Sequence, residues 1–373
     1  MAGIYIHIPF CKQRCYYCDF HFTTSLQNEE RIISAIQKEI ITRKNEINEP
    51  IKSIYIGGGT PSILKEGKIE GLIETIYKHY QVVEKPEITL EANPDDLELK
   101  KVIEYKNSGI NRFSIGIQSF HQKDLEFMNR AHNSLQAEKC IPLVQDAGFD
   151  NITIDLIYGI PTQSDIEWNK NIDKFLSLNV KHLSAYALTV EEKTPLNKLI
   201  SSGKYPNVSD EKSFNDFKQL ISRIESSGFE QYEISNFCKD ENYSIHNSSY
   251  WKGDKYLGFG PSAHSYDSKN RRWNLSSNKL YLEGIDNNSY FEEELLSNSD
   301  KFNELLLTGL RTKWGVNLKE LENSIDVKSF SEFTNNLKSL INSKKVIIVD
   351  DKLLINKEYK FQSDGITSEL FII

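Results

Sequence analysis

The sequence predicts an α/β fold: an open, partial (β/α)6 TIM-like barrel followed by a small C-terminal α+β domain of winged-helix-like outline. Short β-branched runs alternate with longer amphipathic stretches from residue 3 to about residue 190, which is the pattern of strand-helix units around a parallel sheet. Six such units are too few for a closed eight-stranded barrel. After about residue 300 the pattern changes to two helices and a short hairpin.

The elements of the barrel can be assigned one by one. Apolar residues at helical spacing predict helices at Glu29–Lys44 and Ile69–Tyr80. A chain of 373 residues is long enough for one large and one smaller domain. We predict a barrel over 1–235, a connecting segment over 236–299 and the small domain over 300–373. The six expected strands are Gly3–Ile8, Ser53–Ile56, Glu87–Ala92, Arg112–Ile117, Asn151–Ile157 and His182–Ala187.

The small domain is expected to contain helices at Phe302–Leu310 and Lys328–Ser343, and a hairpin at Val346–Ile355 that turns at Asp350 and Asp351. Winged-helix outlines are common in DNA-binding proteins. However, residues 300–373 contain eleven Lys or Arg and eleven Asp or Glu, and the whole chain has a net charge of -8. Since phosphate binding needs a basic face, we expect no nucleic-acid partner and a docking or lid role instead.

The cysteine content and the hydrophobic pattern also indicate the cellular compartment of the protein. The five cysteines do not form a disulfide framework, because three of them are clustered within eight residues. The start of the chain has no positively charged segment followed by an apolar stretch, and no apolar run reaches the length of a membrane span. These features predict a cytoplasmic protein.

The clustered cysteines are Cys11, Cys15 and Cys18. Iron–sulfur cubes commonly take four cysteine thiolates, so three on one short loop would leave one iron open to another ligand. Zinc is the alternative, because His21 follows Cys18 by three residues and would complete a closed Cys3His site. The loop alone leaves both metals open.

Polar and glycine residues follow several of the predicted strands. Glu91, Gln118 and Asp155 each interrupt an apolar strand at its end, and a glycine run, 57–59, follows the second strand. A polar residue at one strand end is often only a turn or a cap. Because parallel barrels carry their functional residues at the carboxyl ends of the strands, the joint pattern favours one binding face. The glycine run matches neither the dinucleotide fingerprint nor the phosphate loop, but its bare backbone can approach a ligand closely.

Six segments, in order, resemble the coproporphyrinogen dehydrogenase-like branch of the radical S-adenosylmethionine (SAM) superfamily over essentially the whole chain: YIHIPFCxxxCxxCDF, IGGGTPS, LEANP, GIQSF, MNRAH and IDLIYGIP. The resemblance implies a [4Fe–4S] cluster on the three cysteines, with SAM chelated at the open iron. It implies that Tyr5 lies against SAM near the cluster, and that Gly58, Gly59 and Thr60 hold its methionine end. The residues expected to line the rest of SAM are Glu91, Gln118, Arg130 and Asp155.

Two features resemble the heme chaperones of this branch more than its oxidases. Phe20 stands where the oxidases carry a fourth cysteine, and only two residues precede Gly3. In addition, the run from His246 to Trp251 resembles an HNxxYW motif of the heme chaperones. The resemblance implies heme bound through His246, transfer to respiratory-chain hemoproteins, and peripheral contact with a membrane. The alternative activity is that of oxygen-independent coproporphyrinogen III dehydrogenase, which forms protoporphyrinogen IX.

Several site assignments have a simpler alternative. His246 could be a structural histidine held in a turn by Asn247, and we expect His264, a second candidate, to lie in a packed turn that closes the barrel. Lys12 and Arg14 could pair with heme propionates or be solvated charges. Tyr16 and Tyr17 are expected to cover the cluster. A third hypothesis is a zinc-stabilised barrel that serves as a binding module.

Overall fold

The computed structural model describes residues 1–372. Its main sheet contains six parallel strands that lie side by side in sequence order, as the strand pattern predicts. Each predicted strand is present: β6 has the predicted ends, and the ends of the other five differ from the prediction by at most five residues. The strands are β1 (Ala2–Ile8), β2 (Ile51–Gly58), β3 (Val82–Ala92), β4 (Arg112–Gln118), β5 (Ile152–Tyr158) and β6 (His182–Ala187).

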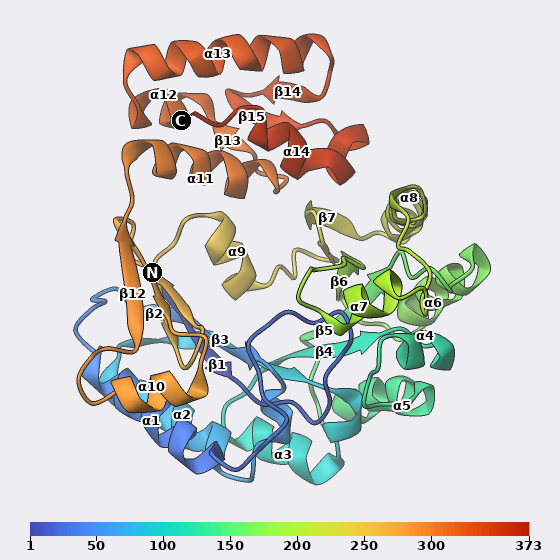
Figure 1. The fold of residues 1–373 in the computed structure, drawn as a ribbon, viewed down its shortest axis with the longest axis vertical. Coiled ribbons are helices and arrows are strands. Elements are labelled where there is room, and N and C mark those ends of the chain that lie inside the picture. Colours follow the sequence, from blue (N-terminus) through green and yellow to red (C-terminus); the bar gives the residue numbers. More distant parts are fainter. Residues whose placement is uncertain (373) are drawn as a thin grey trace.

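Helices cover one face of these strands, which is the outer face of the barrel (Figure 1). The two helices predicted from apolar spacing are confirmed as α1 (Glu29–Thr42) and α2 (Lys68–His79). The others in this region are α3 (Leu99–Asn107), α4 (Gln122–Phe127), α5 (Ser134–Asp146), α6 (Asp165–Ser177), α7 (Pro195–Ser201) and α8 (Asp210–Ser226), with 3-10 turns η1 (Pro61–Ile63) and η2 (Pro94–Asp96).

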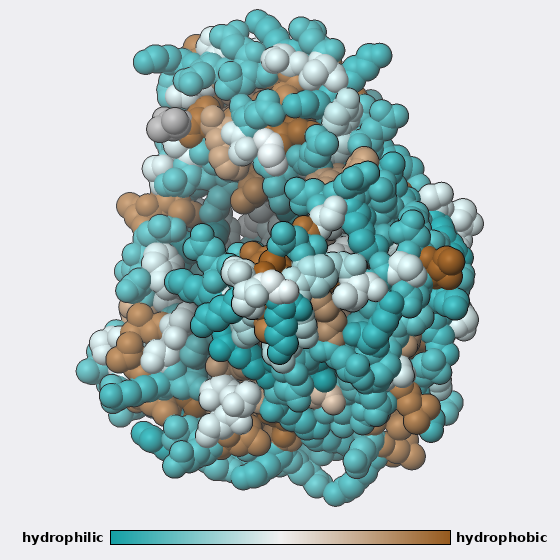
Figure 2. Space-filling view, turned by 45° about the vertical axis from the view of Figure 1, so that its right-hand side comes forward, coloured by the Kyte–Doolittle hydropathy of each residue, from teal (hydrophilic) through white to brown (hydrophobic). Residues whose placement is uncertain are grey.

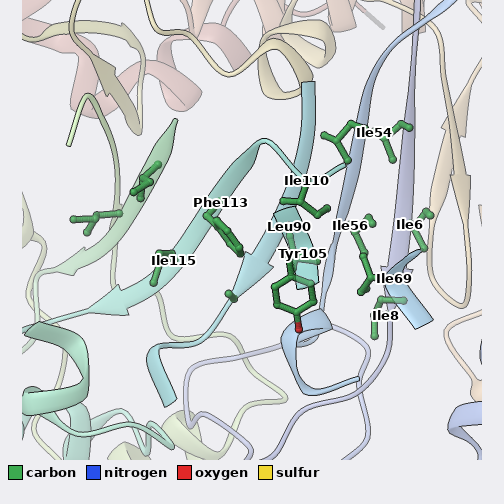
Figure 3. Close-up of a cluster of buried hydrophobic side chains, with 14 of the residues drawn as sticks. Ile6, Ile8, Ile54, Ile56, Ile69, Leu90, Tyr105, Ile110, Phe113 and Ile115 are labelled. Atoms are coloured by element: carbon green, nitrogen blue, oxygen red, sulfur yellow. The ribbon is translucent and has the colours of Figure 1, made fainter. Parts of the chain in front are cut away.

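The two faces of the sheet differ in chemistry because successive side chains of a strand point to opposite faces. Side chains such as Ile6, Ile54 and Leu90 form the apolar core under the helices (Figure 3). The alternate residues make an inner face that is largely polar. This inner face includes Tyr5, Ser53, Tyr55, Glu87, Thr89, Glu91, Arg112, Ser114, Thr153, Asp155, His182 and Ser184.

Six further strands, which the sequence analysis did not predict, extend the sheet at both edges. Beside β1 lie the parallel strand β9 (Tyr256–Phe259) and then three antiparallel strands, while two antiparallel strands lie beyond β6. The sheet of the described residues is therefore open, in agreement with the predicted partial barrel. The remaining elements are β7 (Glu230–Glu233), β8 (Asn236–Cys238), β10 (His264–Tyr266), β11 (Asn270–Asn274), β12 (Phe291–Leu295) and helix α10 (Asn278–Gly284).

One short helix, α9 (Ile245–Trp251), lies on the concave side of the sheet (Figure 1). It contacts β1 and β2. Its start is fixed by Glu87, whose carboxylate accepts hydrogen bonds from the backbone N–H groups of Ile245 (3.0 Å) and His246 (2.9 Å). A carboxylate at this end of a helix satisfies donors that have no partner within the helix. The helix therefore forms the floor of the barrel interior.

The C-terminal elements form a separate apolar core around Phe302, Leu306 and Phe333. Their order of helix, strand, two helices and two strands is that of a winged helix, and the predicted helices and hairpin are present. Asp350 and Asp351 have φ of 49° and 60°, which suits a two-residue hairpin turn. The elements are α11 (Asn298–Leu310), β13 (Val316–Asn317), α12 (Leu318–Ser324), α13 (Val327–Asn342), β14 (Val346–Val349), β15 (Lys352–Ile355), η3 (Lys357–Gln362) and α14 (Ser363–Ser368).

The C-terminal part packs on the barrel through the residues that follow α11. The backbone N–H of Lys313 donates to the carbonyl of Tyr232 (2.9 Å), and the guanidinium of Arg311 lies 5.2 Å from the ring centroid of Trp251 at the end of α9. The face in Figure 2 is mostly hydrophilic, with small separate apolar patches. Among the described residues, no helix combines the length and the apolar character that a membrane span requires.

Candidate functional site

The three cysteines lie on a loop that crosses the carboxyl ends of the strands. All three are half-buried free thiols. The loop is held by two backbone hydrogen bonds, one at the first cysteine and one between the second and third: Cys11 N–H donates to the carbonyl of Thr23 (3.0 Å), and Tyr16 N–H donates to the carbonyl of Met128 (3.0 Å). The thiols are therefore fixed next to the residues that follow β2, β3 and β4.

Two of the thiols accept hydrogen bonds from predicted site residues. The hydroxyl of Thr60 lies 3.5 Å from Cys11 Sγ, and Nη1 of Arg130 lies 3.3 Å from Cys15 Sγ. Asn93 joins the two donors, because its Nδ2 donates to Thr60 Oγ1 (3.3 Å) and its Oδ1 accepts from Arg130 Nη2 (2.6 Å). Asn93 was not among the site residues predicted from the sequence, although its position two residues after Glu91 at the end of β3 could have suggested such a role.

Arg130 is the central residue of this network. Its Nη2 also donates to the carbonyl of Gly116 (2.9 Å), its Nη1 donates to the hydroxyl of Tyr17 (3.2 Å), and its Nε is buried without a partner. Hydrogen-bond donors directed at cysteine sulfurs are what an iron–sulfur cluster requires, because such bonds stabilise its charge and tune its potential. The donor set around the loop thus fits a cluster.

The alternative with zinc depends on His21, which would have to join the thiols. Its Nε2 is instead hydrogen-bonded to Asn278 Oδ1 at 2.8 Å. Within residues 1–372, no three His, Cys, Asp or Glu side chains are arranged to hold one metal ion. A closed tetrahedral site requires four ligands around one ion, whereas an iron–sulfur cube distributes its thiolates over several irons. The hydrogen bond of His21 to Asn278 therefore gives no support to a closed Cys3His site.

The glycine run at the end of β2 packs against the end of β1 and the residues just before Cys11, with no room for side chains. Gly58 has φ of 107°, and a Cβ there would lie 2.6 Å from Nδ1 of His7. A Cβ on Gly59 would lie 2.5 Å from the carbonyl oxygen of Phe10. Because the second obstacle is backbone, it cannot rotate away. These glycines are needed to hold the two loops together, whatever they bind.

The polar strand-end residues lie on the inner face, as predicted. Glu91 accepts hydrogen bonds from the hydroxyl of Tyr55 (2.7 Å) and the N–H of Gly58 (3.1 Å), and loss of solvation raises the pKa of Glu91. Asp155 accepts from the hydroxyl of Ser114 (3.2 Å). Loss of solvation and the charge of Glu91 raise the pKa of Asp155 to about 7. Gln118 ends β4 with φ of 64°. The site therefore contains two carboxyl groups in a poorly solvated space.

His246 projects from α9 into the same interior but is fully engaged there. It is 2% exposed, its Nδ1 lies 2.9 Å from Ser53 Oγ, and its Nε2 lies 2.8 Å from the hydroxyl of Tyr250. The ring stacks near Tyr5, with centroids 6.5 Å apart. Burial lowers the pKa of His246 to about 3. The residues that hold it are Ser53 and Tyr250, rather than Asn247 as the structural alternative supposed.

A cavity of about 910 Å³, within the range usual for cofactor pockets, opens beside Glu91 and Tyr250, whereas Asp155 and His246 are not among its lining residues. Of the two basic residues proposed for propionates, Arg14 lines this cavity, whereas Lys12 forms ion pairs with Asp95 (2.8 Å) and Asp96. His264 is exposed at the start of β10, so the expectation that it lies in a packed turn is wrong. Other lining residues are Tyr5, His7, Gly58, Glu91, Asp19, Phe20, His21, Phe22, Tyr250 and Tyr256.

Comparisons with known proteins define the class. Residues 5–175 match the model of the Radical SAM superfamily. The structure is similar to that of the Escherichia coli coproporphyrinogen III oxidase HemN, described as a radical SAM enzyme, with a TM-score of 0.86 and 21% identity over 99% of this chain and 90% of that one. The radical SAM fold predicted from the motifs is confirmed.

Proteins with similar sequences define the class of this protein more closely. The chain is 35% identical to the heme chaperone HemW of Bacillus subtilis (strain 168) over 86% of both proteins. It is 32% identical to the heme chaperone HemW of Lactococcus lactis over 99% of this chain and 97% of that one. The chain therefore belongs to the heme chaperone HemW family within the radical SAM superfamily, which confirms the resemblance found in the sequence.

Proposed function

We propose that this chain is a heme chaperone that carries a [4Fe–4S] cluster on Cys11, Cys15 and Cys18, binds SAM at the strand ends, and holds heme in the 910 Å³ cavity for transfer to hemoproteins. Membership of the HemW family supports the class of function. The observation that carries the proposal for this chain is the cavity itself, which has aromatic walls and lies directly beside the cysteine loop. When bound, the cluster and SAM supply one-electron chemistry that no protein side chain offers.

The residues of the chain orient SAM in this proposal. Backbone groups of Gly58 and Gly59 bind the methionine end, and Tyr5 packs against the cofactor. The carboxyl groups of Glu91 and Asp155 accept hydrogen bonds from ribose hydroxyls, while Gln118 lines the same space. Arg130 stabilises the cluster through its contact with Cys15 Sγ. Thr60 does the same at Cys11.

The cavity wall opposite the cysteine loop belongs to α9 and the β9–β10 edge of the sheet. Tyr250 from α9 contributes to this wall, while His246 stands behind it. That His246 binds the heme iron stays a prediction, and it requires one of its two hydrogen bonds to break. Arg14 can pair with a propionate at the cavity mouth.

We also propose that the acceptors are hemoproteins of the respiratory chain, which the chaperone meets at the cytoplasmic side of a membrane by transient contact. A labile cluster requires a reducing compartment, which supports this location. The C-terminal part lies beyond α9, away from the cysteine loop (Figure 1), which suits a docking role.

The experiment that tests the function is a titration of anaerobically isolated, cluster-reconstituted protein with heme, followed by visible absorption. We expect uptake of heme together with the iron and sulfide of the cluster. A colourless protein that contains stoichiometric zinc in place of iron would contradict the proposal. A second assay with SAM, a reductant and coproporphyrinogen III tests the oxidase alternative, and formation of protoporphyrinogen would replace the chaperone assignment.

A further inference from the structure

We propose that His264, at the start of β10, is the residue that ligates the heme iron; this inference rests on the proposed heme-binding function. The carrier function and the identity of the iron ligand can be tested separately. The proposal differs from the one drawn from the HNxxYW motif, which places the ligand on α9.

The hydrogen bonds of the histidines in this region separate His264 from the others. His7 bonds through both ring nitrogens, to the hydroxyl of Tyr5 (3.1 Å) and the carbonyl of His21 (2.9 Å). His21 bonds through Nε2 to Asn278 and has no partner at Nδ1 among the described residues, whereas His246 bonds through both nitrogens. Among residues 1–372, the His264 side chain has no hydrogen-bond partner, and it lines the cavity. His264 therefore differs from the other three in that neither of its ring nitrogens is engaged by a described residue, so it can bind iron without losing an existing bond.

The backbone holds His264 at the cavity wall. The residue is paired with Trp273 across the antiparallel strands β10 and β11, and the two rings stack with centroids 6.4 Å apart. Trp273 is itself fixed, because its Nε1 donates to Glu292 Oε2 (3.0 Å). The imidazole is therefore supported on one side by an aromatic ring and is open to the cavity on the other.

The rest of the cavity suits a porphyrin bound at this position. Tyr250 and Tyr256 meet edge to face beside His264, with centroids 4.6 Å apart. From the cysteine loop, Phe20 lines the cavity and is 68% exposed. A porphyrin face is an apolar surface that would cover it. Arg14 supplies a positive charge for a propionate, although Asp19 also lines this wall.

In this arrangement His246 has a positioning role. Its hydrogen bond at 2.8 Å holds the hydroxyl of Tyr250, a residue of the cavity wall. Replacement of His246 would therefore loosen the wall and weaken heme binding without removing the iron ligand. A loss of affinity alone cannot distinguish the two histidines, whereas the spectrum of the bound heme can.

The test compares the full-length, cluster-reconstituted protein with His264→Ala, His246→Ala and the control His79→Ala, which alters a histidine at the end of α2 on the outer face. Each is titrated with hemin, and ferric heme is examined by visible absorption and electron paramagnetic resonance. Loss of an outer partner of a metal ligand already costs about 10–100-fold in affinity, so we expect His264→Ala to cost at least about tenfold. The spectrum of heme bound to His264→Ala should show a change of the axial ligand, and added imidazole should restore the wild-type spectrum.

We expect His246→Ala to bind heme more weakly but to keep the wild-type signature, and His79→Ala to behave as wild type. The iron content of each variant and its far-ultraviolet circular dichroism report whether the fold is retained. If His264→Ala keeps the wild-type affinity and signature, the inference is overturned while the carrier function stands. If the wild-type protein takes up no heme, the proposed function fails, and the inference fails with it.

Discussion

The inner face of the barrel has two polar layers that differ in how completely their groups are bonded. In the lower layer, next to α9, Arg112 lies 3.7 Å from the carboxylate of Glu87, and the hydroxyl of Thr153 lies 3.0 Å from Nδ1 of His182. Nε2 of His182 then bonds to the hydroxyl of Tyr232 at 2.8 Å. In the upper layer, at the strand ends, Glu91 and Asp155 have only hydroxyl and amide partners and raised pKa values.

The difference indicates what each layer does. Buried polar groups that satisfy one another stabilise a single arrangement and offer nothing to a ligand. Carboxyl groups that lack a cationic partner in a poorly solvated space are costly, and a ligand with hydroxyl or ammonium groups relieves that cost. We infer that the lower layer is structural and that the upper layer is the binding surface.

The largest effect is expected at the cysteine loop, which crosses the strand ends next to the upper layer. Cys15→Ala removes one of only three thiolates, so reconstituted protein should lose essentially all of its cluster absorption and iron. Cys140→Ala, a buried cysteine of α5 far from the loop in sequence, is the matched control and should retain both. Full iron content in Cys15→Ala would show that the loop does not hold the cluster.

The lower layer is tested by Arg112→Met. The change leaves Glu87 as a buried carboxylate without its cation, which typically costs about 3–5 kcal/mol. We expect a drop of that size in the free energy of unfolding, measured with denaturant, and unchanged SAM affinity in the protein that remains folded. A variant that is as stable as wild type but binds SAM poorly would reverse the assignment of the two layers.

The upper layer is tested by Arg130→Gln. This change removes the charge next to Cys15 Sγ and Tyr17 but keeps an amide donor. A residue that hydrogen-bonds to a metal ligand usually contributes about 10–100-fold to affinity or activity. We expect loss of this order in SAM affinity and a shifted cluster potential, both measured on reconstituted protein. Lys123→Gln, on the exposed side of α4, is a control that should change neither.

The smallest expected effect is a dependence of the free energy of unfolding on pH, caused by Asp155. Its pKa of about 7 in the folded protein exceeds the ordinary value of about 3.9, so the folded state binds the extra proton between these pH values. The free energy of unfolding therefore falls as pH rises from 4 to 7, and the loss is complete above pH 7.

Asp155→Asn removes this loss. After allowance for the partial exposure of the side chain, we expect the variant to exceed wild type by about 2 kcal/mol at pH 8 and to equal it at pH 4. Denaturant unfolding at the two pH values measures the difference. An equal difference at both pH values would mean that Asp155 does not titrate in this range.

Local patterns were enough to predict the parallel strands and the strand-end site. The strands consist of β-branched runs that differ clearly from the helical segments, and the cysteine and glycine loops follow two of them directly. Glu91 and Asp155 reach the same inner face because strand period and parallel register leave them no other position. None of these inferences requires knowledge of distant contacts.

The sequence could not predict features that depend on partners far along the chain. Strand β9 is four residues long and joins the sheet only because β1 offers it a parallel edge. Lys12 has the same local context as Arg14, yet Asp95 and Asp96 pair with it across more than eighty residues. For the same reason, the exposure of His264 and the burial of His246 followed only from the folded structure.

The contact between Arg311 and Trp251 links the end of α11, the first helix of the C-terminal part, to the barrel floor. Shortening the chain before residue 298 would remove α11, strip this end of α9 of its cover, and leave Tyr243 without Trp314, whose ring centroid lies 5.6 Å away. A terminal module whose described residues supply none of the cavity lining thus supports α9, which supplies Tyr250.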